Sequence, residues 1–305
     1  MASIKEVRNH IASIKDTQKI TGAMYLIAST KMRKAKKNLD QTRPYFDALQ
    51  AEIKRIFRTV DSVESKYFYP PDEKNHDLGG SYSYLVITAD KGLAGSYNQN
   101  VIKEAQRIMG DRPGNKLFVV GEYGRTYYTS HGIPIEKSFL YTAQNPTLER
   151  ARDISSILLN EFLYGDTTKI FVVYTDYGGG LHTKTCSARL LPFHRASFIT
   201  QSNEKAVTKP FEFTPSVNKI LDTIVPSYVT GYIYSALVDS FCSEQNARMM
   251  AMEAANKNAS AMIHDLSIQY NRVRQAMITQ EITEVIAGAK AQKKKKKARK
   301  EVLSN

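Results

Sequence analysis

The residues best suited to chemistry form a short glycine loop, DKGLAG, which follows the apolar segment SYSYLVIT. Backbone N–H groups in such loops point at anions, so Asp90, Lys91, Gly92 and Gly95 invite comparison with phosphate-binding loops. The glycines are spaced GxxG, however, and neither GxGxxG nor GxxxxGK(S/T) occurs in the sequence. Because the carboxylate of Asp90 would also repel a phosphate, we interpret these glycines as tight-turn residues.

Other reactive side chains are scattered along the chain. The six histidines never occur at HxxxH or HExxH spacing, and Cys186 and Cys242 form no CxxC pair or Cys/His cluster. No GxSxG motif is present, and no pair of carboxylates stands out at a strand end. We therefore predict no metal, no cofactor and no catalytic site, and we expect two reduced structural thiols.

Positive charge is concentrated near the two ends of the chain. Among 305 residues, 43 Lys and Arg oppose 30 Asp and Glu, for a net charge of +13. Residues 1–58 carry +8 and residues 290–301 carry +7, so all the remaining residues together carry −2.

The first basic cluster contains Lys31, Arg33 and Lys34, followed by Lys36 and Lys37. It is either a solvated helix face or a contact with an acidic surface on a partner. Exposed ion pairs contribute about 0–1 kcal/mol each and are screened by salt, so such contacts would steer a partner without locking it.

The second basic cluster, KAQKKKKKARKEVLSN, begins at Lys290 and includes five consecutive lysines. Their mutual repulsion predicts an extended, solvated tail. Nucleic acid, anionic lipid and an acidic protein surface would all attract this tail. No aromatic residue is interleaved to stack on bases, so nothing selects nucleic acid.

Residues 1–58 carry an apolar ladder with 3-4-3-4 spacing, which is the seam of a coiled coil. The ladder comprises Ile4, Val7, Ile11, Ile14, Tyr25, Ala28, Met32, Ala35, Leu39, Phe46, Leu49, Ile53 and Ile56. Gln18, Thr21 and Thr42 occupy missing rungs, and Pro44 is expected to kink or interrupt the helix. At about 1.5 Å per residue such a helix spans roughly 85 Å, more than a small globular core can cover.

A second long helix is predicted from Pro226 to about Ala291. Its ladder comprises Ile263, Leu266, Tyr270, Val273, Met277, Ile278, Ile282, Val285 and Ala289. Two helices of matched length at opposite ends of the chain predict an antiparallel coiled coil. Six alanines between Ala247 and Ala261 indicate either close approach of the two backbones or simply high helix propensity.

The middle of the chain alternates strand-like and helix-like segments, which predicts an α/β sheet with helical cover. Strands are expected at residues 81–90, 116–121, 169–177 and 183–193, and helices at residues 101–109 and 148–165. Surface connections are expected at residues 62–80 and 200–215.

The longest uncharged stretch has 16 residues and contains Pro226, so we predict no membrane-spanning helix. The N-terminus has no apolar run typical of a secretory signal.

Three segments of the sequence resemble the gamma subunit of the F-type ATP synthase. They are IASIKDTQKITGAMYLIASTKMRKAKK, SYLVITADKGLAGSYN and SEQNARMMAMEAANKNASAMIHDLSIQYNRVRQAMITQEITEVIAGAKA. The resemblance implies a long antiparallel coiled coil of the N- and C-terminal helices plus a central Rossmann-like α/β domain. It divides the chain into an N-terminal shaft helix (1–58), a central α/β foot domain (59–215), a C-terminal shaft helix (216–291) and a basic C-terminal extension (292–305).

The function implied by the resemblance is that of a central rotor stalk. By rotating, the stalk couples ion flow through the membrane c ring to ATP synthesis or hydrolysis in the alpha/beta catalytic head. Nucleotide chemistry then belongs to the beta subunits, and this chain has no catalytic site and no cofactor of its own. The implied partners are the alpha and beta subunits, the epsilon subunit and the c-subunit ring, without nucleic acid. The implied location is the cytoplasmic face of a bacterial cell membrane, as a peripheral protein.

The resemblance also implies a set of residues that contact the beta subunit. These are Met24, Lys31, Arg33, Lys34, Arg248, Arg274, Gln275, Thr279 and Glu281. All are expected to be contact residues and none an acid, base or nucleophile.

The sequence departs from the family in two places. Members commonly have lysine where this chain has Gly22, and they often end near Ala291, 14 residues before Asn305.

An alternative function of another class is a coiled-coil scaffold or nucleic-acid-associated protein that uses its basic tail. A third is a small α/β nucleotide-binding enzyme.

Overall fold

The computed structural model describes residues 4–60, 65–69, 79–110, 114–140, 142–178, 183–194 and 213–303. The chain forms two compact units. The sheet unit comprises Leu26–Ala251, and the helical unit comprises Met1–Tyr25 together with Met252–Asn305. Both units contain parts of two long helices, α1 (Ile4–Thr59) and α6 (Val217–Leu303).

The sheet unit is built on one five-stranded sheet with the order β3-β2-β1-β4-β5. Its strands are β1 (Ser81–Ile87), β2 (Lys116–Val120), β3 (Lys137–Phe139), β4 (Thr167–Asp176) and β5 (Lys184–Leu191). The first four strands are mutually parallel, whereas β5 runs antiparallel to β4. Parallel strands connected through helices confirm the predicted Rossmann-like α/β class.

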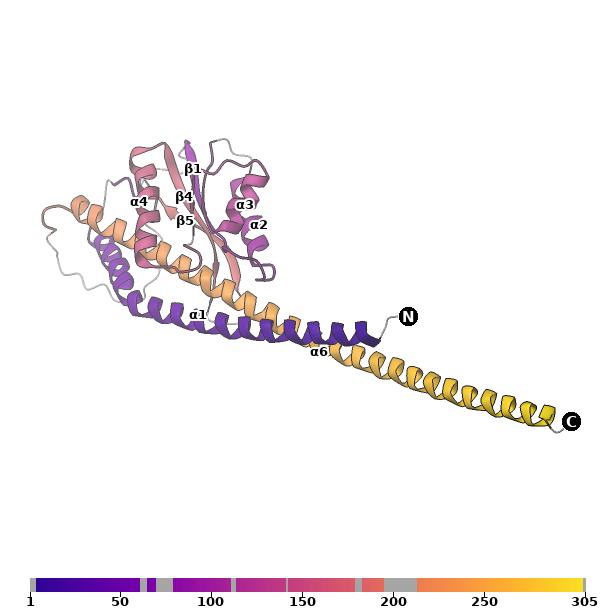
Figure 1. The fold of residues 1–305 in the computed structure, drawn as a ribbon. Coiled ribbons are helices and arrows are strands. Elements are labelled where there is room, and N and C mark those ends of the chain that lie inside the picture. The colour runs from indigo at the N-terminus through magenta and orange to yellow at the C-terminus, as the bar shows by residue number, and fades with distance from the viewer. Residues whose placement is uncertain are drawn as a thin grey trace. The chain divides into compact units, whose positions relative to one another are not determined.

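Both faces of the sheet are covered. The covering helices between the strands are α2 (Tyr97–Met109), α3 (Glu122–Ser130) and α4 (Leu148–Tyr164). Figure 1 shows α2 and α3 on one face of the sheet and α4 on the other. Val86 and Val119 pack with Val101 of α2, whereas Leu85 packs in the opposite layer with Leu158 of α4. Because the sheet is covered on both faces, all seven residues of β1 are buried.

Two elements of the sheet unit were not predicted from the sequence. The segment that forms α3, EYGRTYYTS, contains few strong helix formers. It is fixed by tertiary contacts, since the backbone N–H of Gly124 donates to Thr88 Oγ1 at 3.0 Å. The second element, β3, has only three residues. The connections expected at residues 62–80 and 200–215 lie mostly outside the described residues.

Within the sheet unit, α1 and α6 run antiparallel. Cys242 Sγ lies 3.9 Å from the carbonyl oxygen of Met32. Farther along the pair, Gln50 Nε2 donates to the hydroxyl of Tyr228 at 3.5 Å. As residue numbers rise on α1 they fall on α6, which confirms the predicted orientation. Every rung of the predicted α1 ladder is buried or half-buried.

Within the helical unit, the same two helices are joined by the predicted polar rungs. Gln18 Nε2 donates to Ser260 Oγ at 2.8 Å, and Thr21 Oγ1 bonds to the side-chain oxygen of Asn256. These specific pairs fix the register of the seam. Ala259 is buried against it whereas Ala261 is exposed, so the alanine-rich stretch supplies close packing at some positions and helix propensity at others.

Pro44 does not interrupt α1, which continues to Thr59, and Figure 1 shows α1 bending in its C-terminal half, in keeping with the alternative of a kink. Two expectations for the long helices were wrong. Helix α6 begins at Val217 instead of Pro226, because Ser216 Oγ accepts the N–H of Lys219 at 3.3 Å and caps the first turn. The basic extension is helical as far as Leu303, not extended. Lysine is a good helix former, and adding residues to an existing helix avoids the cost of nucleation.

The two glycines of α6 provide a matched test of packing. A Cβ atom built on Gly231 would lie 2.1 Å from the ring of Phe46, whereas one on Gly288 meets nothing within 4 Å. We expect Gly231→Ala to lower the free energy of unfolding by about 1–3 kcal/mol, because overpacking outweighs the gain in helix propensity. Gly288→Ala should instead raise it by up to about 1 kcal/mol. Urea unfolding measures both, and an unchanged midpoint for Gly231→Ala would contradict the packing described.

Candidate partner-binding surfaces

The basic cluster of α1 lies on an outward face of the sheet unit. Lys31, Arg33 and Lys34 are exposed, whereas Ala28 and Ala35 are buried. Arg33 projects from the side of the helix opposite these alanines, and Lys31 lies at the edge of the buried face. The guanidinium of Arg33 is only weakly engaged, since Nη2 lies 3.4 Å from Ser29 Oγ. The cluster therefore presents its charges to solvent, as required of a surface that meets an acidic partner.

A polar group lies on α6 in the helical unit, where Arg274, Gln275, Thr279 and Glu281 are all exposed. Arg274 and Glu281 are seven residues apart and share one face of the helix. Gln275 and Thr279 are four apart on the adjoining face, and Thr279 Oγ1 donates to the carbonyl oxygen of Gln275 at 2.9 Å. The helix thus brings all four predicted contact residues to one side.

An apolar stripe runs through the same side of α6. We define it as Ile278, Ile282, Val285 and Ile286, whose exposed fractions are 43%, 54%, 71% and 51%. Their spacing of three and four residues aligns them along one helix face. The periodicity placed Ile278, Ile282 and Val285 in the coiled-coil seam, and this prediction is wrong. Half-buried seam positions end at Val273, because the described part of α1 begins at Ile4 and leaves the rest of α6 uncovered.

Met24 lies on α1 in the helical unit and is half-buried. Nearby, a Cβ atom on Gly22 would meet only Asn256 Nδ2, at 4.0 Å. The helix pair therefore leaves space beside Gly22 for a β-carbon.

Arg248 lies differently from the other residues matched to partner contacts. Its side chain is 12% exposed and forms an ion pair with Glu244, whose side chain is 8% exposed. Its Nη2 also donates to the carbonyl oxygen of Gly92 at 2.9 Å. The sequence grouped Arg248 with surface contacts, but in the structure its charge is engaged inside the sheet unit.

The glycine loop uses its polar groups internally. Asp90 Oδ1 accepts the backbone N–H of Glu122 at 3.0 Å, and Gly92 offers a carbonyl oxygen to Arg248. Gly95 has a φ of +55°, which supports the interpretation as a turn residue. Among the described residues, no group of three or more His, Cys, Asp or Glu side chains could hold a metal ion.

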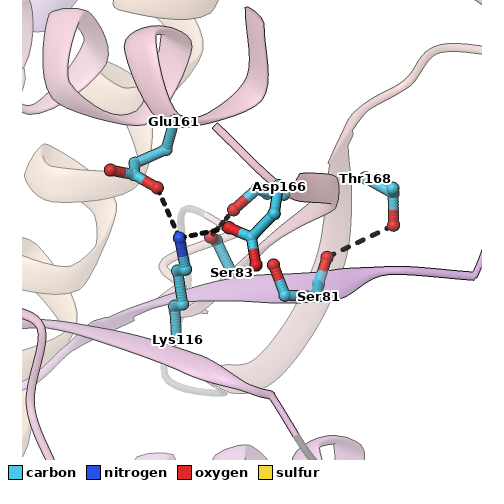
Figure 2. A network of polar contacts seen from close by, with 7 residues as sticks. Ser81, Ser83, Lys116, Glu161, Asp166 and Thr168 are labelled. Atoms are coloured by element: carbon cyan, nitrogen blue, oxygen red, sulfur yellow. Dashed lines mark hydrogen bonds and ion pairs between the residues drawn. The ribbon is translucent and has the colours of Figure 1, made fainter. Parts of the chain in front are cut away.

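A polar network unrelated to any sequence motif lies where several strands begin. Figure 2 shows the ammonium of Lys116 between the carboxylates of Glu161 and Asp166. The Glu161 contact is 2.7 Å long, and both hydrogen bonds raise the pKa of Lys116, the one to Asp166 most. Beside it, Ser83 Oγ and Thr167 Oγ1 lie 2.8 Å apart. The network joins the start of β2 to the end of α4 and β1 to β4, so it positions the strands of the sheet.

Burial shifts the pKa values of the two cysteines and of Asp239. Both cysteines are free, and burial raises the pKa of Cys186 and raises that of Cys242 to about 12. Protonated thiols are poor nucleophiles, which fits a structural role. Burial likewise raises the pKa of Asp239 to about 6, with a smaller contribution from Asp176 and an opposing one from Arg43. Spacing along the sequence gave no signal for Asp239, because its burial arises only when α6 packs.

No described helix is long and apolar enough to cross a membrane. The fold and these surfaces define a protein of paired long helices joined to an α/β sheet, with exposed basic, polar and apolar faces on the helices.

Comparison with known proteins agrees with this class. A family model described as ATP synthase matches residues 3–292. The ATP synthase gamma chain of Caldanaerobacter subterraneus subsp. tengcongensis is 42% identical over 293 residues, covering 93% of this chain and 98% of the relative. The chain belongs to the ATP synthase gamma chain family. This membership leaves the alternative of a nucleic-acid-associated scaffold without support.

Solved structures show the same fold. The central stalk and c-ring structure of Tetrahymena thermophila mitochondrial ATP synthase contains a chain 25% identical, with a TM-score of 0.56, covering 77% of this chain and 99% of its own. A chain in the Euglena gracilis mitochondrial ATP synthase structure, which includes OSCP, F1 and the c-ring, is 17% identical. Its TM-score is 0.67, and 94% of each chain is covered.

The raised pKa of Asp239 predicts a pH-dependent effect of Asp239→Asn. The folded protein holds this proton up to about pH 6, whereas the unfolded chain releases it near 3.8. The ionised carboxylate therefore destabilises the fold increasingly as the pH rises through this window. We expect Asp239→Asn to match the wild type near pH 4 and to be more stable by about 1–3 kcal/mol at pH 8. Urea midpoints at the two pH values measure this, and a difference independent of pH would contradict it.

Proposed function

We propose that this chain is the central rotor stalk of an F-type ATP synthase. In this role it turns within the alpha/beta catalytic head and couples ion flow through the membrane c ring to ATP synthesis or hydrolysis. The chain itself carries out no nucleotide chemistry, which belongs to the beta subunits. Its membership of the ATP synthase gamma chain family supports the proposal.

One structural observation carries the proposal furthest: beyond Val273, every side chain of α6 from Arg274 to Lys293 is exposed. Isolated helices are marginal in water, and most helix stability in proteins comes from burying an apolar face. The apolar stripe therefore needs a cover that the described residues of this chain do not supply. A surrounding sleeve of alpha and beta subunits provides such a cover and still permits the helix to turn.

The surfaces described above then divide among the partners. We propose that Met24, Lys31, Arg33 and Lys34 on α1 meet an acidic part of the beta subunit. Arg274, Gln275, Thr279 and Glu281 on α6 catch a polar loop of beta during rotation. Exposed charge pairs of this kind are individually weak, which suits contacts that must break at each step.

The division of labour along the chain follows the helices. We propose that residues 1–58 and 216–291 form the shaft and that residues 59–215 form the foot. The foot would bind the c-subunit ring and the epsilon subunit. The complex would lie at the cytoplasmic face of a bacterial cell membrane, with this chain as a peripheral component.

Assembly with the head tests this function. Co-expressed with the alpha and beta subunits of its own organism, the full chain should copurify as an ATP-hydrolysing complex. Arg274→Ala with Gln275→Ala should leave assembly intact and lower the hydrolysis rate several-fold, because the catch surface is lost. Gln280→Ala, on the opposite side of α6, should have little effect. A chain that does not copurify would refute the proposal, and a double variant with the wild-type rate would refute the catch.

For the basic C-terminal extension, residues 292–305, we propose a brake or tether that meets an acidic surface at the far end of the head. Replacing Lys293–Lys297 with glutamine keeps the number of residues and removes five charges. We expect this variant, and a chain truncated after Gln292, to hydrolyse ATP about twofold faster at low salt. The difference should vanish near 1 M salt, where the screening length falls to about 3 Å. Equal rates at every salt concentration would exclude both roles.

A further inference from the structure

Arg248 is linked to the loop of residues 90–96, which connects β1 with α2. Its guanidinium pairs with the carboxylate of Glu244, one turn earlier on α6, and donates from Nη2 to the carbonyl oxygen of Gly92 at 2.9 Å. The contact thus joins the shaft helix to a loop more than 150 positions away in sequence. With 12% of its side chain exposed, Arg248 has little surface left for another protein.

The ion pair is held from both sides. Gln245 Nε2 donates to the second carboxylate oxygen of Glu244 at 2.7 Å. Burial raises the pKa of Glu244, and Arg248 opposes this by stabilising the charged form; nearby Asp90 raises the pKa further. Without the guanidinium, a buried carboxylate would lie unpaired beside a second acidic group. The position therefore favours arginine, whose planar fork can bind a carboxylate and a carbonyl together.

The start of the loop and the residue just before it are anchored as well. The backbone N–H of Ala89 donates to Asn98 Oδ1 at 2.9 Å, and Asp90 Oδ1 accepts the N–H of Glu122 at 3.0 Å. The bond from Arg248 adds a third attachment at Gly92, in the middle of the loop. Three attachments to three different helices give the loop a defined shape.

At the tip of this loop, Leu93 has a φ of +62° and is 67% exposed. The left-handed region is unfavourable for a bulky side chain, and such backbone strain is typically kept where it serves binding. Burial of the side chain cannot explain the left-handed backbone conformation of Leu93, because this side chain is exposed to solvent. Lys91 and Gly92 beside it are exposed too.

We infer that Arg248 is a positioning residue, which clamps the loop of residues 90–96 to α6 and thereby presents Leu93 to a partner subunit. The inference rests on the proposed rotor function. The partner surface that fits the loop tip has an apolar pocket for Leu93 and an acidic rim for Lys91. Force on the loop passes through the Gly92–Arg248–Glu244 contact directly into the shaft helix.

The first test measures the loop in the full chain alone, without other subunits. Backbone amide order parameters of residues 91–95 should be near 0.85 in the wild type and fall below about 0.6 in Arg248→Gln. Arg272→Gln, which removes the same charge from an exposed position on α6, should leave them unchanged. Arg248→Lys, which keeps the ion pair with Glu244 but loses the fork, should give an intermediate value. A loop that remains ordered in Arg248→Gln overturns the inference.

The second test uses the assembled complex and measures ions pumped per ATP hydrolysed. Leu93→Ser should lower this ratio at least threefold without changing the order parameters of the loop. Arg248→Gln should lower it to a similar extent, and the double variant should be no worse than Leu93→Ser. If adding Arg248→Gln to Leu93→Ser lowers the ratio by the same factor as Arg248→Gln does in the wild type, Arg248 acts independently of the loop by direct contact. In that case the inference fails. Failure of the wild-type chain to copurify would instead refute the rotor function and leave the loop measurement valid.

Discussion

The structure depends on one constraint: a helix of 56 residues carries an apolar ladder that needs cover along its length. In the sheet unit, α1 and α6 cover each other and also pack on the α4 face of the sheet, so a single core includes Ile53, Leu158 and Ile233. In the helical unit no sheet is available, and the seam relies on half-buried aliphatic residues and on the polar pair of Thr21 with Asn256. Farther along α6, beyond the part that pairs with the first described turns of α1, no described residue covers the apolar stripe, and it stays exposed.

Charged side chains are paired with one another inside the sheet unit and exposed to solvent on the long helices. Inside the sheet unit, charges are paired for positioning: Lys116 holds strand starts together, and Glu244 with Arg248 holds a loop to α6. On the helices, the charges of Lys31 and Arg274 face solvent. A shaft that turns against partners needs a rigid interior and weak, replaceable surface contacts. The paired charges inside the sheet unit provide the rigid interior, and the solvent-exposed charges on the helices provide the weak surface contacts.

Much of this could be predicted from sequence, because long periodic signals are robust to local detail. The α1 ladder, its polar rungs at Gln18 and Thr21, and the α/β alternation were all found. The three-residue strand β3 and the weakly helical α3 were missed, since tertiary contacts such as that of Gly124 with Thr88 specify them. Periodicity also could not reveal where a seam loses its partner. Nor could spacing reveal that Arg248 points inward, which depends on the loop that meets it.

The central claim, that this chain rotates as a shaft, is tested most directly by watching it turn. Tyr164, at the end of α4, is 83% exposed and offers a site for a probe as Tyr164→Cys in a Cys186→Ser background, since Cys242 is buried. With the alpha/beta head fixed to a surface, the probe should rotate in one direction while ATP is supplied and stop when it is withdrawn. A probe that stays still, or only fluctuates, while the same complexes hydrolyse ATP would contradict the account.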